Sequence, residues 1–260
     1  YDSRRFNELT SQYPDNISIL AEGDSWFAYP RRYLILGPDA NVIHQLADRD
    51  NLTIYCTASN GDEAVAMVSG EQKLSLAKRL KYNHFDFLLF SGGGNDVVGI
   101  YDFDYFLNAY APGMSASDLI DWARLEIKLD QVKSAYQMLC EIVKTYSKNL
   151  GIKIVTHTYD FAIPDESGFE LFDIIPLGES WIYPYLVQKG VNDPALQKEV
   201  VRLMLTAFAD MLFSVANDAR YSALLHVVNT QGTINDSEWL NEIHPTTGGF
   251  NKIAQKIYAE

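Results

Sequence analysis

The stretch ISILAEGDSW (residues 17–26) joins a largely apolar run to a glycine, an aspartate and a serine. The run Ile17–Ala21 has the composition of a strand that is buried on both faces of a sheet. Gly23 and Asp24 favour a turn directly after it. Such a turn would leave the Ser25 hydroxyl at the end of the strand, where a second chemical group can meet it.

Four more runs of this kind follow along the chain, and segments with helical spacing of apolar residues separate them. The predicted strands are residues 17–21, 52–56, 85–90, 152–156 and 224–228. The predicted helices are residues 42–48, 74–82, 119–150, 194–216 and 249–258. This alternation predicts an α/β fold with a doubly wound, parallel sheet of five strands and helices on both faces.

The chain has 260 residues, and we find no internal repeat, low-complexity tract or linker in it. We therefore predict one domain over residues 1–260. Two aromatic-rich segments, 97–116 and 159–190, are longer than simple connections. We expect both to be insertions that follow the ends of strands.

The net charge of −13 argues against binding to nucleic acid or to an anionic membrane surface, since both require a positive field. No apolar run reaches the roughly 18–20 residues that a membrane-spanning helix needs. Cys56 and Cys140 lack a CxxC or metal-type spacing, so we predict buried free thiols. A removed signal peptide would leave no trace, and the compartment therefore stays open.

Four polar segments are expected to lie at one edge of this sheet. They are GDSW (23–26), ASNGD (58–62), GGGND (92–96) and, across a polar loop from the fifth strand, NEIHP (241–245). In an open parallel sheet, ligands bind beyond the carboxyl ends of the strands. The four segments should therefore converge on one ligand site.

Together these segments supply the groups needed for acyl transfer. A serine hydroxyl such as that of Ser25 becomes a useful nucleophile when a neighbouring base takes its proton, and His244 is the candidate base. The backbone N–H groups of Ser25 and Gly61 and the side-chain amide of Asn95 are candidate donors to an oxyanion. With an ordinary imidazole pKa, His244 predicts activity that rises through about pH 6–7.

The four segments resemble the four blocks of the SGNH hydrolases, the GDSL esterase/lipase superfamily. Gly23–Ser25 is similar to the first block, Gly61 to the second, Gly93–Asp96 to the third and His244 to the last. The resemblance extends from residue 17 to residue 258, with the blocks in family order. It implies a flavodoxin-like three-layer αβα fold and ester hydrolysis through an acyl-serine intermediate, without a metal or an organic cofactor.

The chain departs from the family pattern at two positions. Trp26 stands where the first block usually continues with leucine. Asn241 stands where the family has the aspartate that orients the histidine. The Asn241 amide oxygen can accept a hydrogen bond from His244, but it supplies no negative charge for the imidazolium. Glu242 or Asp236 could serve as the acid instead.

Several of these residues also have structural interpretations. Asp24 is expected to stabilise the turn by accepting backbone hydrogen bonds. His157, after the fourth strand, is expected to be a structural histidine, with a place at the site rim as the alternative. We attribute Gly92–Gly94 to close approach of backbone to a substrate oxygen. Trp26 is a candidate for substrate contact, and packing beneath a loop is the alternative.

The sequence therefore predicts a serine hydrolase that acts on an ester of a small molecule, a lipid or an acylated sugar. The alternative is a protein that keeps this scaffold, binds a carbohydrate or acyl ligand and has lost useful turnover; Asn241 is its support. The physiological ester, the length of its acyl chain and the oligomeric state stay open.

Overall fold

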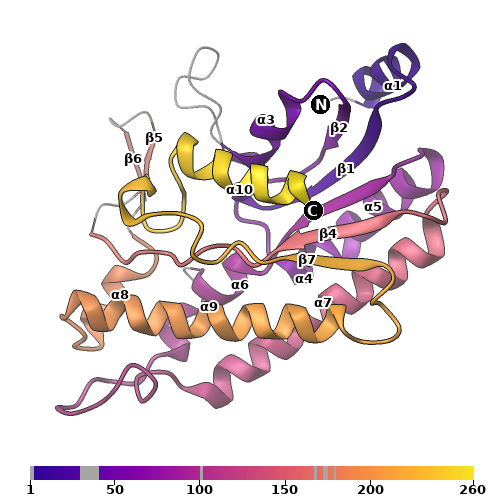
Figure 1. Cartoon of the computed structure of the whole chain (residues 1–260). Helices are drawn as coiled ribbons and strands as arrows, with labels where there is room; N and C mark the ends of the chain where they lie inside the picture. Colours follow the sequence, from indigo (N-terminus) through magenta and orange to yellow (C-terminus); the bar gives the residue numbers. More distant parts are fainter. Residues whose placement is uncertain (1–2, 30–40, 100–101, 167–168, 172–174, 179) are drawn as a thin grey trace.

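The computed structural model describes residues 3–29, 41–99, 102–166, 169–171, 175–178 and 180–260. At its centre lies a parallel sheet of five strands in the order β2-β1-β3-β4-β7 (Figure 1). The strands are β1 (Ile17–Gly23), β2 (Leu52–Cys56), β3 (Phe87–Ser91), β4 (Lys153–His157) and β7 (Leu225–Val228). The predicted five-stranded parallel sheet is confirmed, and each strand end lies within two residues of the prediction.

The strand β1 occupies the interior of the sheet, between β2 and β3. Ile19 lies opposite Ile54 on one side and Phe87 on the other. Every residue of β1 after Ile17 is buried. Because helices cover both faces, the strand lacks the apolar–polar alternation of a sheet that is exposed on one face.

Helices form a layer on each side of the sheet (Figure 1). One layer contains α4 (Ala64–Met67), α5 (Gly70–Tyr82), α7 (Trp122–Tyr146) and α9 (Pro194–Ala216), with α7 packed against the other three. The other layer contains α3 (Val42–Ala47) and α10 (Thr247–Ala259), which pack against each other. The helix α1 (Ser3–Gln12) packs against β2. The predicted three-layer, doubly wound architecture is confirmed.

Two predicted helices differ from the structure by more than two residues at one end or both. The helix predicted over 119–150 is shorter, because Asp121 caps its first turn and the backbone leaves the helical conformation at Ser147. The helix predicted over 74–82 begins earlier, at Gly70. Periodicity locates a helix, whereas its ends depend on local caps.

Several short elements were not predicted. They are α2 (Ser25–Ala28), α4, α6 (Gly94–Val98), α8 (Tyr183–Gln188), the 3-10 turns Phe103–Phe106 and Asp236–Glu238, and the strands β5 (Phe169–Leu171) and β6 (Ile175–Gly178). Each is too short to show a helical or strand period. The antiparallel pair β5–β6 and α8 lie within the predicted insertion 159–190. The single domain over 1–260 stays a prediction, and residues 100–101, 167–168, 172–174 and 179 of the two insertions lie outside the described residues.

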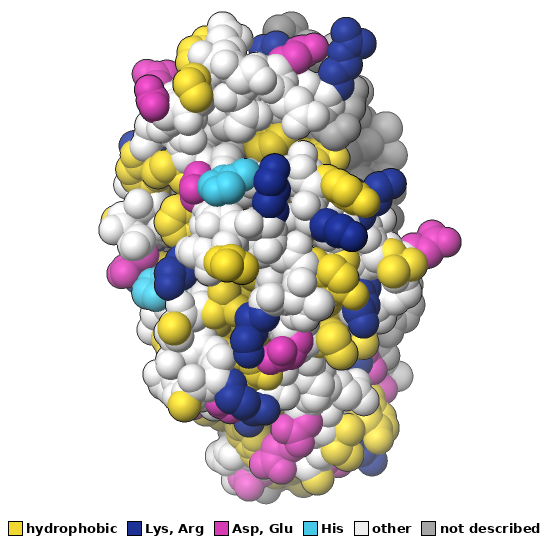
Figure 2. Space-filling view, turned by 90° about the vertical axis from the view of Figure 1, so that its right-hand side faces the viewer, with side chains coloured by type: hydrophobic (Ala, Val, Ile, Leu, Met, Phe, Trp, Pro, Cys, Tyr) yellow, Lys and Arg dark blue, Asp and Glu magenta, His cyan; other side chains and the backbone are white. Residues whose placement is uncertain are grey.

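Figure 2 shows the side of the molecule at which the strands begin. Basic, acidic and apolar side chains are interspersed on this face, so it carries no field of a single sign. Among the described residues, no helix is both long enough and apolar enough to cross a membrane.

The glycines of the GGGND segment make room for aromatic rings of the protein itself. A Cβ atom on Gly93 would lie 2.5 Å from a ring atom of Phe208, and one on Gly92 would lie 2.7 Å from the ring of Phe90. Gly93 also has a φ of +107°, in the left-handed region. From the sequence we attributed these two glycines to a close approach between the backbone and a substrate oxygen. In the structure, the packing of the Phe90 and Phe208 rings accounts for them instead.

We predict that Gly93→Ala lowers the free energy of unfolding by about 2–4 kcal/mol, from the left-handed φ and the clash with Phe208 together. The control is Gly113→Ala, since Gly113 has a φ of +92° but open space around its Cα. That variant should lose only about 1 kcal/mol. Urea unfolding measures both values, and equal losses would contradict the packing argument.

Candidate active site

Ser25 begins the short helix α2 at the carboxyl end of β1. The ladder between β1 and β3 continues one residue past β1, where Asp24 N donates to Ser91 O at 2.9 Å. Asp24 is the N-cap of α2, and its carboxylate accepts a hydrogen bond from Trp26 N at 3.0 Å. This confirms the expected role of Asp24 in the turn, which holds Ser25 at the carboxyl edge of the sheet.

His244 lies in a tight loop before α10. The Asn241 side-chain oxygen accepts hydrogen bonds from the backbone N–H groups of Ile243 (3.2 Å) and His244 (2.9 Å). Leu240 N donates to His244 O at 2.8 Å, which closes the loop. These local bonds fix the backbone from which the imidazole extends.

The fold brings the two predicted catalytic side chains together across 219 residues of sequence. His244 Nε2 lies 2.7 Å from Ser25 Oγ. His244 Nδ1 lies 3.2 Å from the same Asn241 oxygen. Because that oxygen can only accept, the proton sits on Nδ1 and leaves Nε2 free to accept from the serine hydroxyl. This is the tautomer that a general base requires.

The other two candidates for the orienting acid are engaged elsewhere. The Glu242 carboxylate accepts backbone N–H bonds from Trp181 (2.5 Å), Tyr183 (2.7 Å), Ile182 (3.1 Å) and Asp165 (3.2 Å). Asp236 is exposed and pairs with Lys198 at 2.7 Å.

Burial sets the protonation state of His244. Its side chain is 1% exposed, and the Tyr29 ring lies 4.1 Å away, centroid to centroid. Burial disfavours the charged imidazolium and lowers the pKa of His244 to about 3. The ordinary imidazole pKa assumed from the sequence is therefore wrong, and His244 is neutral at every pH above about 4.

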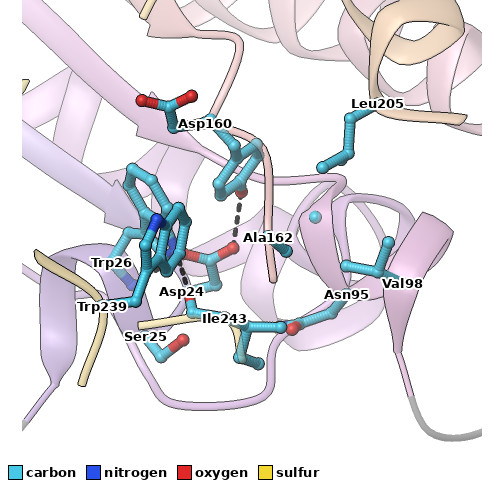
Figure 3. Close-up of a pocket in the computed structure, with 12 residues that line it drawn as sticks. Asp24, Ser25, Trp26, Asn95, Val98, Asp160, Ala162, Leu205, Trp239 and Ile243 are labelled. Carbon is cyan, nitrogen blue, oxygen red and sulfur yellow. Dashed lines mark hydrogen bonds between the residues drawn. The ribbon is translucent and has the colours of Figure 1, made fainter. Parts of the chain in front are cut away.

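The two predicted oxyanion donors from other segments lie differently. Asn95, near the start of α6, lines the same small pocket as Ser25 (Figure 3), and its Nδ2 donates to Asp62 O at 2.9 Å. Gly61 is exposed, has a φ of +81° and is not among the described residues that line this pocket. The structure thus brings Asn95, but not Gly61, to the pocket wall.

The pocket beside Ser25 is small, with a volume of about 20 Å³, which is room for about one water molecule. Its wall combines the aromatic side chains of Trp26, Tyr159 and Trp239 with the aliphatic side chains of Val98, Ala162, Leu205 and Ile243 (Figure 3). No Lys or Arg lines it among the described residues.

Trp26 is 4% exposed, and its contacts are with the protein. Its indole N–H donates to Ile243 O at 3.1 Å. Its ring stacks on His157, with the centroids 5.2 Å apart. Substrate contact by Trp26 stays a prediction, and so do the catalytic roles of the residues above.

Ser91 and Tyr159, which contact Asp24, were not among the predicted site residues, and His157 is linked to Asp24 through Ser91. Ser91 Oγ donates to the Asp24 carboxylate at 2.9 Å, Tyr159 OH donates to it at 2.5 Å, and His157 contacts Ser91 at 3.0 Å. His157 is 1% exposed with both ring nitrogens bonded, so the structural interpretation of His157 is confirmed. The sequence signal for Ser91 and Tyr159 was their position: Ser91 ends β3, and Tyr159 follows β4.

Acidic side chains elsewhere are paired with lysines. Asp102 lies 2.7 Å from Lys128, and Asp104 lies 3.0 Å from Lys189. Among the described residues, no group of three or more His, Cys, Asp or Glu side chains has the arrangement of a metal site.

Comparisons with known proteins give matches at the level of structure. No family model and no curated protein matches the chain. The lipase Lip_vut3 from a goat rumen metagenome superposes with a TM-score of 0.57 at 14% identity, over 94% of this chain and 97% of that one. LAE5, an alpha/beta hydrolase enzyme from the metagenome of Lake Arreo, Spain, gives 0.51 at 16% identity, over 94% of each chain. The acetyl xylan esterase AlAXEase gives 0.51 at 13% identity, over 94% and 98%.

At these identities, the matches establish the fold rather than the substrate. They cover nearly the whole of each chain, and the sheet is all-parallel with helices on both faces. The four sequence blocks also follow in family order along the chain. The chain has a three-layer αβα fold that it shares with the lipase Lip_vut3, LAE5 and AlAXEase.

Proposed function

We propose that the protein is a serine hydrolase that cleaves a carboxylic ester through an acyl-serine intermediate. The observation that carries this proposal is the 2.7 Å contact between Ser25 Oγ and His244 Nε2. It is supported by the position of Asn95 on the same pocket wall and by the fold shared with a lipase and an acetyl xylan esterase.

In the proposed reaction, Ser25 Oγ attacks the acyl carbon and its proton passes to His244 Nε2. The backbone N–H group of Ser25 and the Asn95 amide, which both belong to the pocket wall, donate to the oxyanion that forms. The tetrahedral intermediate then collapses, and the leaving alkoxide takes the proton from His244. Water, activated by the same imidazole, releases the carboxylic acid and restores the serine.

The substrate is a neutral ester in this proposal, because no Lys or Arg among the described residues lines the pocket to hold a charged acid group. A small-molecule, lipid or acylated-sugar ester fits this condition. The protein need not bind a metal or an organic cofactor for these steps, since the serine and histidine supply both the nucleophile and the base.

One observation favours the second candidate function, a binding protein with impaired turnover. Asn241 orients His244 without supplying a negative charge, and burial disfavours the imidazolium that the reaction must form. A site of this kind would bind a carbohydrate or an acyl ligand and turn it over slowly or not at all.

Labelling with a fluorophosphonate probe separates the two functions. We expect the wild type to be labelled and to hydrolyse p-nitrophenyl acetate, and Ser25→Ala to be unlabelled and at least about 10³-fold slower. The control is Ser18→Ala, which removes a buried hydroxyl at the other end of β1 and should keep both properties. A wild type that resists the probe and matches Ser25→Ala in rate would favour the binding function.

We also predict that Asn241→Asp raises kcat. A carboxylate at this position can accept the same N–H bonds, and its charge stabilises the imidazolium that forms during the reaction. In serine proteases the reverse change costs about 10⁴-fold, so a gain of about tenfold or more is expected.

The control for this variant is Asn229→Asp, because the Asn229 oxygen also accepts a local backbone N–H bond, from Gln231 at 3.1 Å, and Asn229 follows β7 rather than belonging to the loop that carries His244. It adds the same charge and should leave kcat within about twofold. Steady-state kinetics of both variants measure the effect, and equal rates in the two would contradict the role of Asn241.

A further inference from the structure

Four buried polar side chains lie next to the residue that carries the proposed nucleophile. We call Asp24, Ser91, His157 and Tyr159 the Asp24 network. Their exposed fractions are 1%, 0%, 1% and 4%. They come from the ends of β1, β3 and β4, so the network joins the three central strands at the edge that carries the pocket.

The hydrogen bonds of the network have a defined direction. His157 Nδ1 accepts from Tyr159 N at 3.1 Å, so the ring proton sits on Nε2 and is donated to Ser91 Oγ at 3.0 Å. The Ser91 hydroxyl then donates to one Asp24 oxygen at 2.9 Å. Tyr159 OH donates to the other Asp24 oxygen at 2.5 Å, the length of a charge-assisted hydrogen bond. Every donor therefore ends at the Asp24 carboxylate.

The same carboxylate fixes the start of α2. It accepts the Trp26 N–H at 3.0 Å, and Ser25 lies between the two residues that make this bond (Figure 3). A rotation of the carboxylate would break the cap and shift the backbone of Ser25. Tyr159 and Ser91 prevent that rotation by holding both oxygens.

A second arm of these contacts reaches the histidine loop. The Trp26 ring stacks on His157 and meets the Tyr159 ring edge-on, with centroids 5.0 Å apart. Its indole N–H holds Ile243 O, one residue before His244. The Asp24 network and Trp26 thus hold the backbone next to Ser25 and the backbone next to His244.

Tyr159 adopts a conformation that the chain would not choose locally. Its φ of 56° is the single positive φ among the non-glycine residues described. Such a conformation is unfavourable for a residue other than glycine, and it persists when the surroundings of the residue fix it. Thr230 Oγ1 donates to Tyr159 O at 2.7 Å, and the His157 ring accepts its N–H. The strained backbone aims the phenol at Asp24.

We propose that Tyr159 is a positioning residue for ester hydrolysis: by holding the Asp24 carboxylate, it sets the place of Ser25 relative to His244. The proposal rests on the function proposed above. It assigns Tyr159 no contact with the reacting atoms, and its effect passes through Asp24.

The network also predicts a pH dependence. Burial raises the pKa of Asp24 to about 6, and the Tyr159 hydrogen bond is the largest effect that lowers it. The groups around Asp24 are Tyr159, Ser91 and the neutral His157, with Asp96 as the nearby like charge. Below pH 6 the protonated oxygen of Asp24 can no longer accept a hydrogen bond in the same way, so the bond from Tyr159 or Ser91 must reverse its direction or break. Activity should therefore fall as the pH falls through about 6, and because burial lowers the pKa of His244, we assign this change to Asp24, which the Asp24→Asn variant below tests.

The experiment compares two buried tyrosines. Tyr159→Phe removes the hydrogen bond to Asp24, whereas Tyr136→Phe removes an equally buried one, from Tyr136 OH to Gly92 O at 2.7 Å, without touching Asp24. We expect Tyr159→Phe to lower kcat about tenfold or more with little change in KM. A decrease of this size corresponds to the loss of one hydrogen bond to a charged group. Its acid limb should move to a higher pH. Tyr136→Phe should keep the kcat and the acid limb of the wild type.

Ser91→Ala tests the same idea at the other Asp24 oxygen and should change kcat and the acid limb in the same direction. Asp24→Asn removes the titrating group, so its remaining activity should be flat through pH 6. Thermal unfolding of each variant separates loss of fold from loss of positioning.

The outcomes divide clearly between the two proposals. If the wild type is labelled and active but Tyr159→Phe behaves as Tyr136→Phe does, the positioning role is wrong and the hydrolase function stands. An acid limb near pH 6 that persists in Asp24→Asn also overturns it. A wild type that neither reacts with the fluorophosphonate probe nor hydrolyses the ester overturns the function, and the positioning role with it.

Discussion

The hydrogen-bonded ladder between β1 and β3 is the constraint on which the candidate site depends. Gly23 lies opposite Ser91, and the ladder continues for one further bond, from Asp24 N to Ser91 O. That bond brings the side chains of Asp24 and Ser91 together, and Ser25 follows one residue later. The place of the proposed nucleophile is therefore decided by the register of two buried strands, which a shift of one residue would destroy.

Burial has two opposite effects on the proposed chemistry. It keeps His244 neutral, which makes the imidazole available as a base over a wide range of pH. It also disfavours formation of the imidazolium, and the Asn241 amide supplies a dipole and no negative charge to stabilise it. The rate of the proposed reaction then depends on geometry more than on a charged partner, which is why the contacts that position Ser25 matter.

The sequence predicted the elements that have local signals. Apolar runs located all five strands of the main sheet, and apolar periodicity located the long helices α7 and α9. Both patterns depend only on residues that are close together in the sequence. The order of the motifs predicted that Ser25 and His244 would meet. The short helices α2 and α6 span about one turn each, so no period could reveal them.

Features that depend on distant contacts could not be predicted. The choice between Asn241 and Glu242 as the partner of His244 depends on where each side chain points, and Glu242 is held by backbone groups about 60 to 77 residues away. The low pKa of His244 follows from its burial, which is a property of the folded chain alone. The place of Tyr159 after β4 did not reveal its role, since its φ and its hydrogen bond to Asp24 are known only from the fold.

The carboxylate of Glu242 has one more consequence. Glu242 lies two residues before His244, and its carboxylate accepts hydrogen bonds from four backbone N–H groups of the second insertion. These belong to Asp165 and to residues 181–183. In the proposed hydrolase, a bulky ester that displaced this insertion would either break the hydrogen bonds to the Glu242 carboxylate or move the loop that carries His244. The size of the substrate would then affect the position of the proposed base.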